Sequence, residues 1–292
     1  MSSINVIGPG SLGLCIGAAL IDNNHYVNFI GRQKISELTI YRKNTVFRNH
    51  AINNISDIDS ITESDWLLIS VKSHQISAAK DVILSAIRAN TKIAVIQNGV
   101  SHIDNMNDIG VFDNLLAVMV DLPANRINAS EVIWHEKAIM YVNDSDLGKE
   151  FCELFSNSFV NVNTTTDIKT KLWRKLCVNA PSGALLCLTG KHMAVYHEEG
   201  IADIGRGILQ EVINVGRKEG AILSNDIIEE QMTAFLNAKP EETNSMFDDF
   251  KAGIPTEWKA RNAVIVKLGK KHGVPTPISN LLVPLLAAQK RL

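Results

Sequence analysis

The chain has 292 residues, of which 46% are hydrophobic and 21% are charged, and its formal net charge is −2. This composition is typical of a globular protein with two domains or one large domain. The small net charge offers no basic surface for nucleic acid or an anionic membrane, and no apolar run is long enough to span a bilayer. We therefore expect neither a nucleic-acid partner nor a membrane partner.

The N-terminus enters an apolar run directly, without the basic and apolar regions of a signal peptide. The cysteines have no CxxC spacing, and the histidines form no HxxxH or HxH pair. These patterns predict a cytoplasmic protein with reduced thiols and no metal site. The cysteines are Cys15, Cys152, Cys177 and Cys187.

A glycine motif follows the first predicted strand, at residues 4–7. It reads Gly-x-Gly-x-x-Gly and opens an apolar helix. In such a motif the first glycine permits a tight turn, the second lets the backbone approach a pyrophosphate, and the third lets the helix pack on the sheet. N–H groups at the helix start favour an anion. The motif predicts a dinucleotide site, with a ligand-free glycine turn as the alternative. The predicted cofactor-binding residues here are Gly8, Gly10, Ser11, Leu12 and Gly13.

The second predicted strand, at residues 27–30, ends in Gly31-Arg32, and Lys34 follows. An enzyme that uses NAD usually has Asp or Glu at this strand end, where the carboxylate accepts from the ribose 2′-hydroxyl. A guanidinium instead suits a 2′-phosphate, which it can bind through two hydrogen bonds. We therefore predict NADP(H) as the cofactor. The alternative for Arg32 is an exposed loop cation.

Strands and helices alternate through the first half, which predicts an α/β domain whose parallel sheet is covered by helices on both faces. The polar run at 163–167 marks the predicted boundary. The pattern is helical beyond it, so we expect an all-α C-terminal domain. The predicted domains are 1–166, for the cofactor, and 167–292, for substrate and catalysis. Further strands are predicted at 66–71, 92–96 and 115–120, antiparallel edge strands within 132–142, and helices at 75–89, 169–178, 201–219, 226–238 and 256–272.

Polar residues follow two of the predicted parallel strands. Ligands bind beyond the carboxyl ends of such strands. Lys72 is placed to reach a cofactor or substrate anion, and Asn98 can donate or accept beside a nicotinamide or a ribose. The structural alternatives are an exposed lysine and a simple Asn-Gly turn.

Lys175 and Asn179 lie four residues apart in a predicted helix and therefore share one face. Reduction of a ketone needs a hydride on carbon and a proton on oxygen. A lysine can supply that proton and stabilise the developing charge. A helix start is predicted at 244–249, with Ser245 or Asn244 as its cap, and Ser245 could hold a substrate carboxylate there. Glu257 lies in a predicted first helical turn. The structural alternatives are that Lys175 is an exposed lysine, that Ser245 is only a helix cap and that Glu257 is stabilised by the helix dipole.

These elements together resemble the ketopantoate reductase (2-dehydropantoate 2-reductase) family. The motifs are GPGSLG at 8–13, VKSHQ at 71–75, QNGV at 97–100, LWRKLCVNA at 172–180, NSM at 244–246, PTE at 255–257 and HGVPTP at 272–277. The resemblance covers essentially the whole chain. It implies a Rossmann domain followed by a helical domain, and the reduction of ketopantoate to pantoate with NADPH in pantothenate biosynthesis.

The resemblance also implies roles for the residues that match its motifs. Lys175 resembles the general acid, and Glu257 resembles the acid that positions the lysine and a substrate hydroxyl. Asn98 and Asn179 resemble substrate or nicotinamide contacts, and Ser245 resembles the contact to the substrate carboxylate. Arg32 and Lys72 resemble residues that contact the cofactor, and the contact of Arg32 is to the 2′-phosphate.

The chain departs from the family pattern at several positions. Lys259 stands where the family often has Asp, and Ala263 stands where it often has Gly. The stretch at 121–136 lacks the glycines that the family usually has there, and it has His-Glu in place of a typical His-Gly pair. Another 2-oxo acid or a bulkier ketone therefore remains an alternative substrate. A dehydrogenase of another keto, hydroxy or opine-type acid and a catalytically silent NADP(H)-binding sensor are the alternative functions. The apolar run at 278–288 is expected in the core, with a homodimer surface as the alternative.

Overall fold

The computed structural model describes residues 1–289, which fold into two compact units. The first unit comprises Met1–Gln97 and Ser101–Ile168. The second unit comprises Asn98–Val100 and the chain from Lys169 onward. The functional domain division at 166/167 stays a prediction, and residues 290–292 of its second domain lie outside the described residues.

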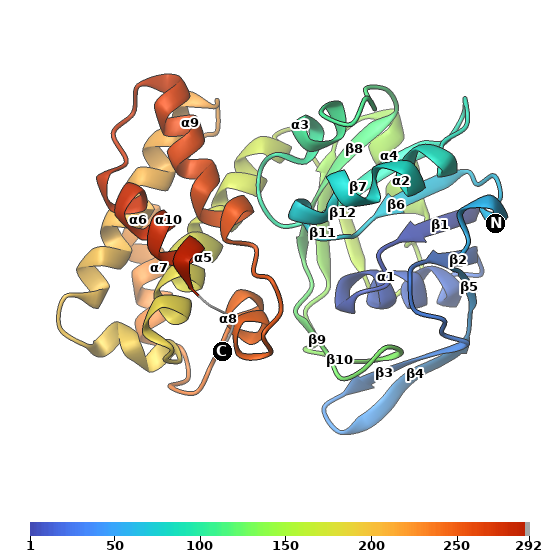
Figure 1. Cartoon of the computed structure of the whole chain (residues 1–292), viewed down its shortest axis with the longest axis horizontal. Helices are drawn as coiled ribbons and strands as arrows, with labels where there is room; N and C mark the ends of the chain where they lie inside the picture. The colour runs from blue at the N-terminus through green and yellow to red at the C-terminus, as the bar shows by residue number, and fades with distance from the viewer. Residues whose placement is uncertain (290–292) are drawn as a thin grey trace. The chain divides into compact units, whose positions relative to one another are not determined.

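The main sheet of the first unit has the strand order β12-β11-β8-β7-β6-β1-β2-β5 (Figure 1). Neighbouring strands from β8 to β5 are parallel, whereas β11 is antiparallel to β8 and parallel to β12. The predicted α/β fold class is therefore confirmed. The strands are β1 (Ser3–Ile7), β2 (Tyr26–Ile30), β5 (Asn53–Ile55), β6 (Trp66–Ile69), β7 (Lys92–Ile96), β8 (Leu115–Asp121), β11 (Ile139–Asn143) and β12 (Asn161–Thr165).

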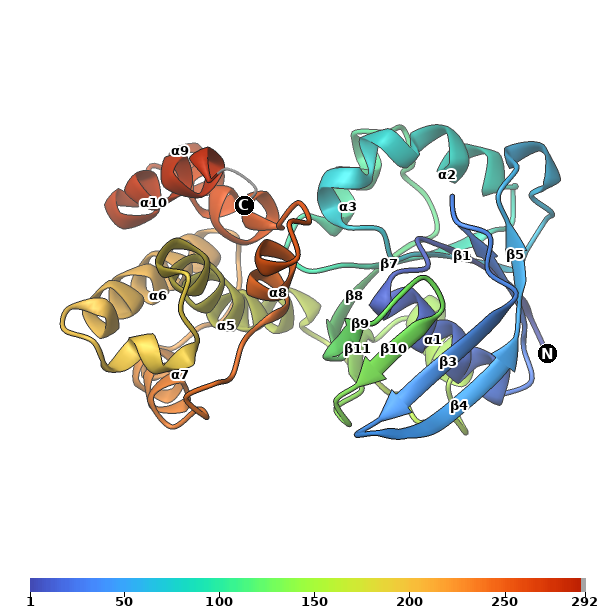
Figure 2. The same cartoon turned by 60° about the horizontal axis from the view of Figure 1, so that its bottom comes forward.

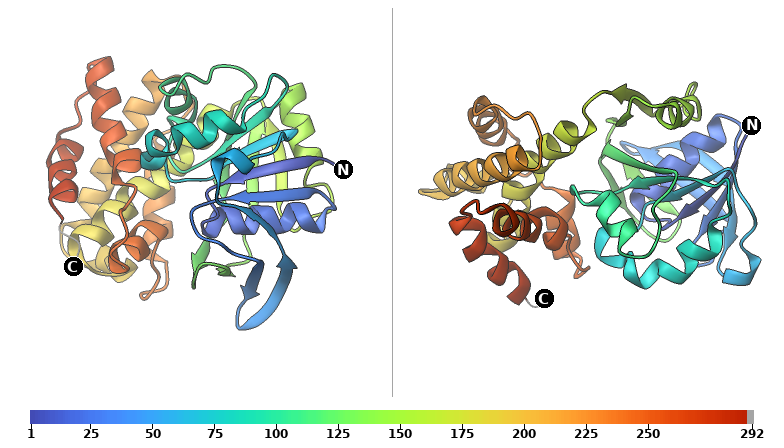
Figure 3. Two further views of the ribbon diagram at one scale, coloured as in Figure 1. Left: turned by 45° about the vertical axis from the view of Figure 1, so that its right-hand side comes forward. Right: turned by 90° about the horizontal axis from the view of Figure 1, so that it is seen from above.

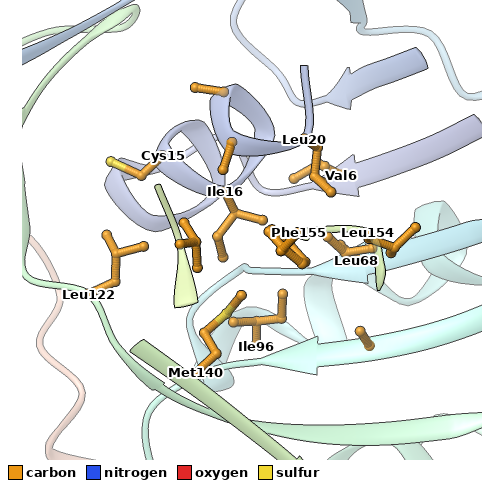
Figure 4. Packing of buried hydrophobic residues seen from close by; sticks show 14 of the residues in the cluster. Val6, Cys15, Ile16, Leu20, Leu68, Ile96, Leu122, Met140, Leu154 and Phe155 are labelled. Atoms are coloured by element: carbon orange, nitrogen blue, oxygen red, sulfur yellow. The ribbon is translucent and has the colours of Figure 1, made fainter. Parts of the chain in front are cut away.

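Alternate residues of the strands pack against helices on opposite faces of this sheet. Val6, Leu68 and Ile96 face α1 (Ser11–Asp22), and Figure 4 shows them beneath Ile16 and Leu20. α4 (Asp146–Glu153) packs on the same face. The intervening strand residues face α2 (Lys80–Ala86) and α3 (His102–Asn107), which cover the opposite face (Figure 3).

A second sheet, which the sequence reading missed, has the order β4-β3-β10-β9 (Figure 2). β3 and β4 form an antiparallel hairpin, β10 is parallel to β3, and β9 is antiparallel to β10. β4 has the sequence TVFRNHA, in which four of the seven residues are polar and none is buried, so it lacks the apolar run or alternation that marks a strand. The strands are β3 (Glu37–Arg42), β4 (Thr45–Ala51), β9 (Ala124–Arg126) and β10 (Glu131–Trp134).

Two other predictions for this unit were wrong in detail, and the polar run at the predicted boundary contains a strand that was not predicted. The helix predicted at 75–89 is shorter, because 3₁₀ turns at Ser73–Gln75 and Ser77–Ala79 precede α2. The region 132–142 contributes to both sheets, since β10 belongs to the second sheet and only β11 extends the main one. The polar run at 163–167 is mostly edge strand β12, where one exposed face tolerates Asn and Thr.

The second unit is helical, as predicted, and α5 lies in its core. This helix runs from Ile168 to Thr189, well beyond the predicted 169–178, and it contains Pro181. It is buried on nearly all sides from Asn179 to Cys187, as expected for a central helix. The surrounding helices are α6 (Ile201–Lys218), α7 (Asp226–Leu236), α8 (Ser245–Lys251), α9 (Val264–His272) and α10 (Pro277–Ala288), with a 3₁₀ turn at Met193–His197.

Among residues 1–289, no helix is both long and apolar enough to cross a bilayer.

Candidate active site

The glycine loop, residues 8–13, joins β1 to α1 and lies against the end of β6. Gly8 has φ +92°, and a Cβ on it would lie 2.6 Å from Val71 Cγ1. A Cβ on Gly13 would lie 2.5 Å from the Gly8 carbonyl oxygen. A Cβ on Gly10, in contrast, would meet no atom of the described chain closer than 4.0 Å. Packing therefore requires glycine at 8 and 13, whereas Gly10 leaves open space above the loop.

The start of α1 presents backbone donors to that space. Gly10 is its N-cap, and no side chain of the described residues caps the helix. The first turn contains no acidic residue. Helix N-termini with uncapped N–H groups bind anions through both hydrogen bonds and the helix dipole. The loop therefore fits the pyrophosphate of a dinucleotide.

Side chains from neighbouring strand ends hold the glycine loop in place. The strand order reverses between β1 and β6, which is where ligands of doubly wound sheets bind. Ser70 Oγ donates to the Gly8 carbonyl at 2.9 Å, and Gln97 Nε2 donates to the Val71 carbonyl at 2.6 Å. Lys72 follows at the same sheet edge, half-buried, with its N–H bonded to Gln75 Oε1 at 3.1 Å. The structure thus places Lys72 beside the glycine loop.

The end of β2 packs directly on the same loop. A Cβ on Gly31 would lie 2.6 Å from Pro9 Cγ, so only glycine fits there. Arg32 comes next and is exposed. Arg126 Nη2 donates to Gln33 Oε1 at 3.0 Å, which adds a second guanidinium to this strand end. The loop at 31–34 is basic and contains no carboxylate that could accept from a ribose hydroxyl.

In the second unit, hydrogen bonds join polar residues that are far apart in the sequence. Asn98 Nδ2 donates to Glu257 Oε2 at 2.9 Å, and Asn179 Nδ2 donates to Asn98 Oδ1 at 3.4 Å. Arg261 Nη2 donates to Glu257 Oε2 at 3.2 Å and to Ser245 Oγ at 2.9 Å. We call these five residues the Glu257 cluster.

The carboxylate of Glu257 is held on one side only. The residue is 5% exposed, and Oε2 accepts both of the bonds described above. Within residues 1–289, Oε1 accepts none, so it is available to a ligand hydroxyl or an ammonium group. Gly99, with φ +103°, turns the chain after Asn98, and a Cβ on it would lie 3.1 Å from the Ala260 carbonyl oxygen. This close approach brings Asn98 to Glu257.

Lys175 lies one turn before Asn179 on α5 and is half-buried. Its neighbour Arg174 is exposed and forms a two-pronged ion pair with Glu230 of α7, at 2.9 and 3.0 Å. The two adjacent cations therefore lie on different faces of the helix. Arg174 is committed to the surface, whereas Lys175 shares the face of a cluster residue.

A π-helical turn at Lys259–Ala263 positions the end of the cluster. Such turns insert an extra residue and are frequent at functional sites. Here Arg261 and Asn262 both point inward, at 1% and 2% exposure, and Asn262 Nδ2 donates to the Ala180 carbonyl at 2.9 Å. Glu257 precedes the turn and its carbonyl accepts the Ala260 and Arg261 N–H groups. The single helix predicted at 256–272 is therefore this turn followed by α9.

The sequence offers Asn244 and Ser245 as candidate caps of α8, and the structure decides between them. Asn244, not Ser245, is the N-cap, and its Oδ1 accepts from the N–H groups of Met246 and Phe247. Those N–H groups are thereby satisfied and are not presented to a ligand. The hydroxyl of Ser245 remains exposed, backed by Arg261.

Sequence reasoning missed Arg261 altogether. It lies four residues after Glu257, a spacing at which opposite charges pair on a helix, and that spacing was the available signal. Ser70 and Gln97 were also missed as supports of the glycine loop, because their partners are main-chain carbonyls.

The thiols of the second unit are poor candidates for the chemistry. Burial raises the pKa of Cys177 and of Cys187 to about 12, so neither forms a thiolate near neutral pH. In the described part of the chain, no three His, Cys, Asp or Glu residues form a cluster that could hold a metal ion.

Comparison with known proteins identifies the family. The model of the family described as Ketopantoate reductase PanE/ApbA matches residues 4–146, and the model of its C-terminal domain matches residues 167–290. A 2-dehydropantoate 2-reductase from Caulobacter vibrioides is 30% identical over 99% of both chains. The chain belongs to the ketopantoate reductase family. The predicted resemblance is thereby confirmed, and the protein is an oxidoreductase.

Solved structures of similar proteins share this fold. A dimeric ketopantoate reductase from Staphylococcus aureus matches with a TM-score of 0.87 and 23% identity, over 98% of both chains. A structure of D-mandelate dehydrogenase with NADH and anilino(oxo)acetate also has a TM-score of 0.87, with 21% identity over 98% of this chain and 97% of that one. At these identities the matches establish the fold.

Proposed function

We propose that this ketopantoate reductase family member reduces a 2-oxo acid to the 2-hydroxy acid with NADPH, and that 2-dehydropantoate is its leading substrate. The observation that carries the proposal is the Glu257 cluster, in which hydrogen bonds join Asn179 to Asn98 and Asn98 to the buried carboxylate of Glu257. Asn179 lies one helical turn from Lys175 on α5. A cofactor-binding protein without catalysis has no need of this arrangement. Family membership supplies the reaction type.

The proposed catalytic roles are those that the resemblance implies for these residues, and the hydrogen bonds of the Glu257 cluster support them. Lys175 donates a proton to the carbonyl oxygen and stabilises the charge that develops there. Glu257 Oε1 accepts from a substrate hydroxyl and helps to position the lysine, while Asn98 and Asn179 orient substrate or nicotinamide. A bound nicotinamide cofactor supplies the hydride that the carbonyl carbon receives. The carbonyl π-electron pair then becomes the O–H bond of the alcohol.

The cofactor is proposed to lie on the glycine loop with its pyrophosphate at the start of α1. Gly8, Gly10 and Gly13 shape the loop, and the N–H groups of Ser11 and Leu12 are the first donors of the helix. Arg32 would bind the 2′-phosphate, and Lys72 would contact the cofactor from the end of β6. The basic loop at 31–34 supports NADPH over NADH.

Steady-state kinetics tests this proposal directly. The purified protein should reduce 2-dehydropantoate faster than the other members of a panel of 2-oxo acids, and NADPH should be used more efficiently than NADH. Loss of cofactor absorbance at 340 nm measures both. Failure to reduce any 2-oxo acid in the panel would contradict the proposal.

A second function is favoured by the departures from the family pattern. Lys259 is exposed, with its ammonium 5.7 Å from the centre of the Trp258 ring, and Ala263 adds a methyl group to the π-helical turn. Both residues lie in the π-helical turn that follows Glu257. These departures support a bulkier 2-oxo acid or the oxidation of a 2-hydroxy acid, the type of ligand that mandelate dehydrogenase handles. Assays in both directions distinguish the two functions.

Two further expectations stay predictions. A homodimer is proposed by analogy with the dimeric Staphylococcus aureus protein, and light scattering during size-exclusion chromatography measures it. The cytoplasmic location rests on the sequence alone.

A further inference from the structure

Helix α5 is irregular at the stretch that contains Asn179. Pro181 lies inside this helix, and because it has no N–H group it leaves the Cys177 carbonyl without its usual helical donor. Ser182 Oγ donates to the Val178 carbonyl at 2.7 Å, a type of bond that tends to bend helices. The hydrogen bonds of the helix backbone therefore fix the position of Asn179 less firmly than they would in a regular helix.

The π-helical turn at Lys259–Ala263 packs against this stretch of α5. Asn262 Nδ2 donates to the Ala180 carbonyl at 2.9 Å. A Cβ on Gly183 would lie 3.8 Å from Arg261 Cδ, which is an ordinary van der Waals distance. The turn therefore meets α5 both before and after the proline.

The side chain of Asn262 makes a single hydrogen bond within the described chain. The residue is 2% exposed, and its Oδ1 atom is buried without a partner among residues 1–289. Burial of an amide is unfavourable unless its hydrogen bonds are made, and an apolar side chain of similar size would avoid that cost. The bond to the Ala180 carbonyl is therefore the contact that accounts for an asparagine at this position.

The segment that carries Asn262 also carries the carboxylate of the Glu257 cluster. The carbonyl of Glu257 accepts from the N–H groups of Ala260 and Arg261, so the carboxylate residue and the turn form one hydrogen-bonded segment. Asn262 joins this segment to α5 at the residue that directly follows Asn179. One side chain therefore connects the two parts of the chain that supply the proposed catalytic groups.

We propose that Asn262 is a positioning residue that holds α5 at Pro181. This contact sets the positions of Lys175 and Asn179 relative to the carboxylate of Glu257. The inference rests on the proposed function, because it concerns the groups that carry out the proposed reaction. The role requires no contact of Asn262 with substrate or cofactor. Its bond supplies from outside the helix a constraint that α5 loses at the proline.

The test uses full-length variants in the reduction of 2-dehydropantoate by NADPH. Asn262→Leu removes the donor at similar size. Pro181→Ala restores the N–H group that a regular helix provides, so it should make the bond from Asn262 dispensable. Gln289→Leu is the matched control, because Gln289 Nε2 donates at 2.6 Å to the Cys187 carbonyl, further along the same helix.

We expect Asn262→Leu to lower the rate constant of NADPH oxidation in a single turnover about 30-fold, because a small displacement of the proton donor slows the reaction. The amplitude of the turnover and KM for NADPH should stay close to the wild-type values. Partial unfolding would instead lower the amplitude and leave the rate constant unchanged. In the Pro181→Ala background, Asn262→Leu should lower the rate constant at most about threefold. Gln289→Leu should retain the wild-type rate constant.

An unchanged rate constant in Asn262→Leu would overturn the inference and leave the proposed function intact. An equal loss in Gln289→Leu, or an equal effect of Asn262→Leu in the Pro181→Ala background, would overturn it as well. If Asn262→Leu does not fold, Asn262→Ala, which cannot overpack the core, is measured in its place. If the wild-type protein reduces no 2-oxo acid, the proposed function fails, and crystal structures of wild type and variant decide the inference. Displacement of residues 172–180 relative to 257–263 supports it, and superposition of these segments overturns it.

Discussion

The glycine loop of the first unit offers backbone N–H groups to a ligand, and its shape depends on the absence of side chains at Gly8 and Gly13. In the Glu257 cluster of the second unit, the available groups are side chains from four separate segments, at 98, 179, 245 and 257–261. A site made of backbone tolerates any residue that keeps the turn. A site made of side chains depends on the identity of each one and on the packing that brings them together.

This difference predicts the largest effect at Lys175. Lys175→Ala should lower kcat about 1000-fold, because general acid catalysis and charge stabilisation are lost together. Cofactor affinity should hardly change, since the cofactor site belongs to the glycine loop. Stopped-flow kinetics and fluorescence titration with NADPH measure the two quantities.

Lys267→Ala is the matched control for Lys175, because Lys267 is an exposed lysine of α9 in the same unit. It should have wild-type turnover. Wild-type turnover in Lys175→Ala itself would contradict the proposed mechanism.

Substitutions in the glycine loop should act by displacing its backbone. Gly8→Ala places a methyl group 2.6 Å from Val71 Cγ1 at a positive φ, so we expect cofactor affinity to fall about 100-fold and the free energy of unfolding to fall by ~3 kcal/mol. Gly110 has φ +90° with no atom of the described chain near its missing Cβ. Gly110→Ala should therefore cost only ~1 kcal/mol and leave cofactor affinity alone. Equal costs for the two variants in urea unfolding would show that steric contact with Val71 is unimportant.

The Glu257 cluster should show coupling between side chains. Glu257→Gln leaves the buried Arg261 charge unpaired, and Arg261→Met leaves the carboxylate with fewer donors, so each should lower the free energy of unfolding by ~3 kcal/mol. The double variant should be less destabilised than the sum of the two by ~2 kcal/mol. Chemical denaturation of the four proteins completes the cycle, and strictly additive losses would argue against direct pairing.

The smallest effect is expected at Arg32, where a single exposed side chain adds to a site built of backbone. Arg32→Ala should reduce the preference for NADPH over NADH about tenfold, because only NADPH carries the 2′-phosphate. Arg88→Ala is the control, since its exposed guanidinium bonds to carbonyls of Ser85 and Ile87. An equal loss of affinity for both cofactors in Arg32→Ala would contradict the phosphate assignment.

The sequence predicted the glycine loop well because the loop is local. The motif lies within six residues, and the flanking apolar runs predict the strand and the helix that it joins. The contacts of the loop with Ser70 and Val71 come only from the fold. It did not predict the second sheet, because polar residues make up most of β4 and none of its residues is buried. It also did not predict β12, whose Asn and Thr residues lie at the edge of the main sheet. Strand prediction from a sequence depends on apolar residues that mark a buried face, and edge strands bury few of their side chains.

For the Glu257 cluster, motif matching predicted which residues matter but not how they interact. Asn98 and Glu257 are 159 residues apart, and no local pattern indicates that one donates to the other. Arg261 carried a local signal, its spacing from Glu257, yet only the π-helical turn makes both Arg261 and Asn262 point inward. Asn244 and Ser245 were equal candidates for the cap until the backbone of α8 decided between them.

The amino-acid sequence by itself determined the α/β character of the first half and the helical character of the second, the anion-binding turn after β1 and the basic end of β2, because each depends on neighbours within a few residues. The tertiary structure alone decided that Gly99 approaches Ala260, that Asn98 reaches Glu257 and that Arg261 donates to Ser245. These contacts depend on chain segments that meet only after the helices have packed around α5, and burial there removes the water that would otherwise satisfy each polar group.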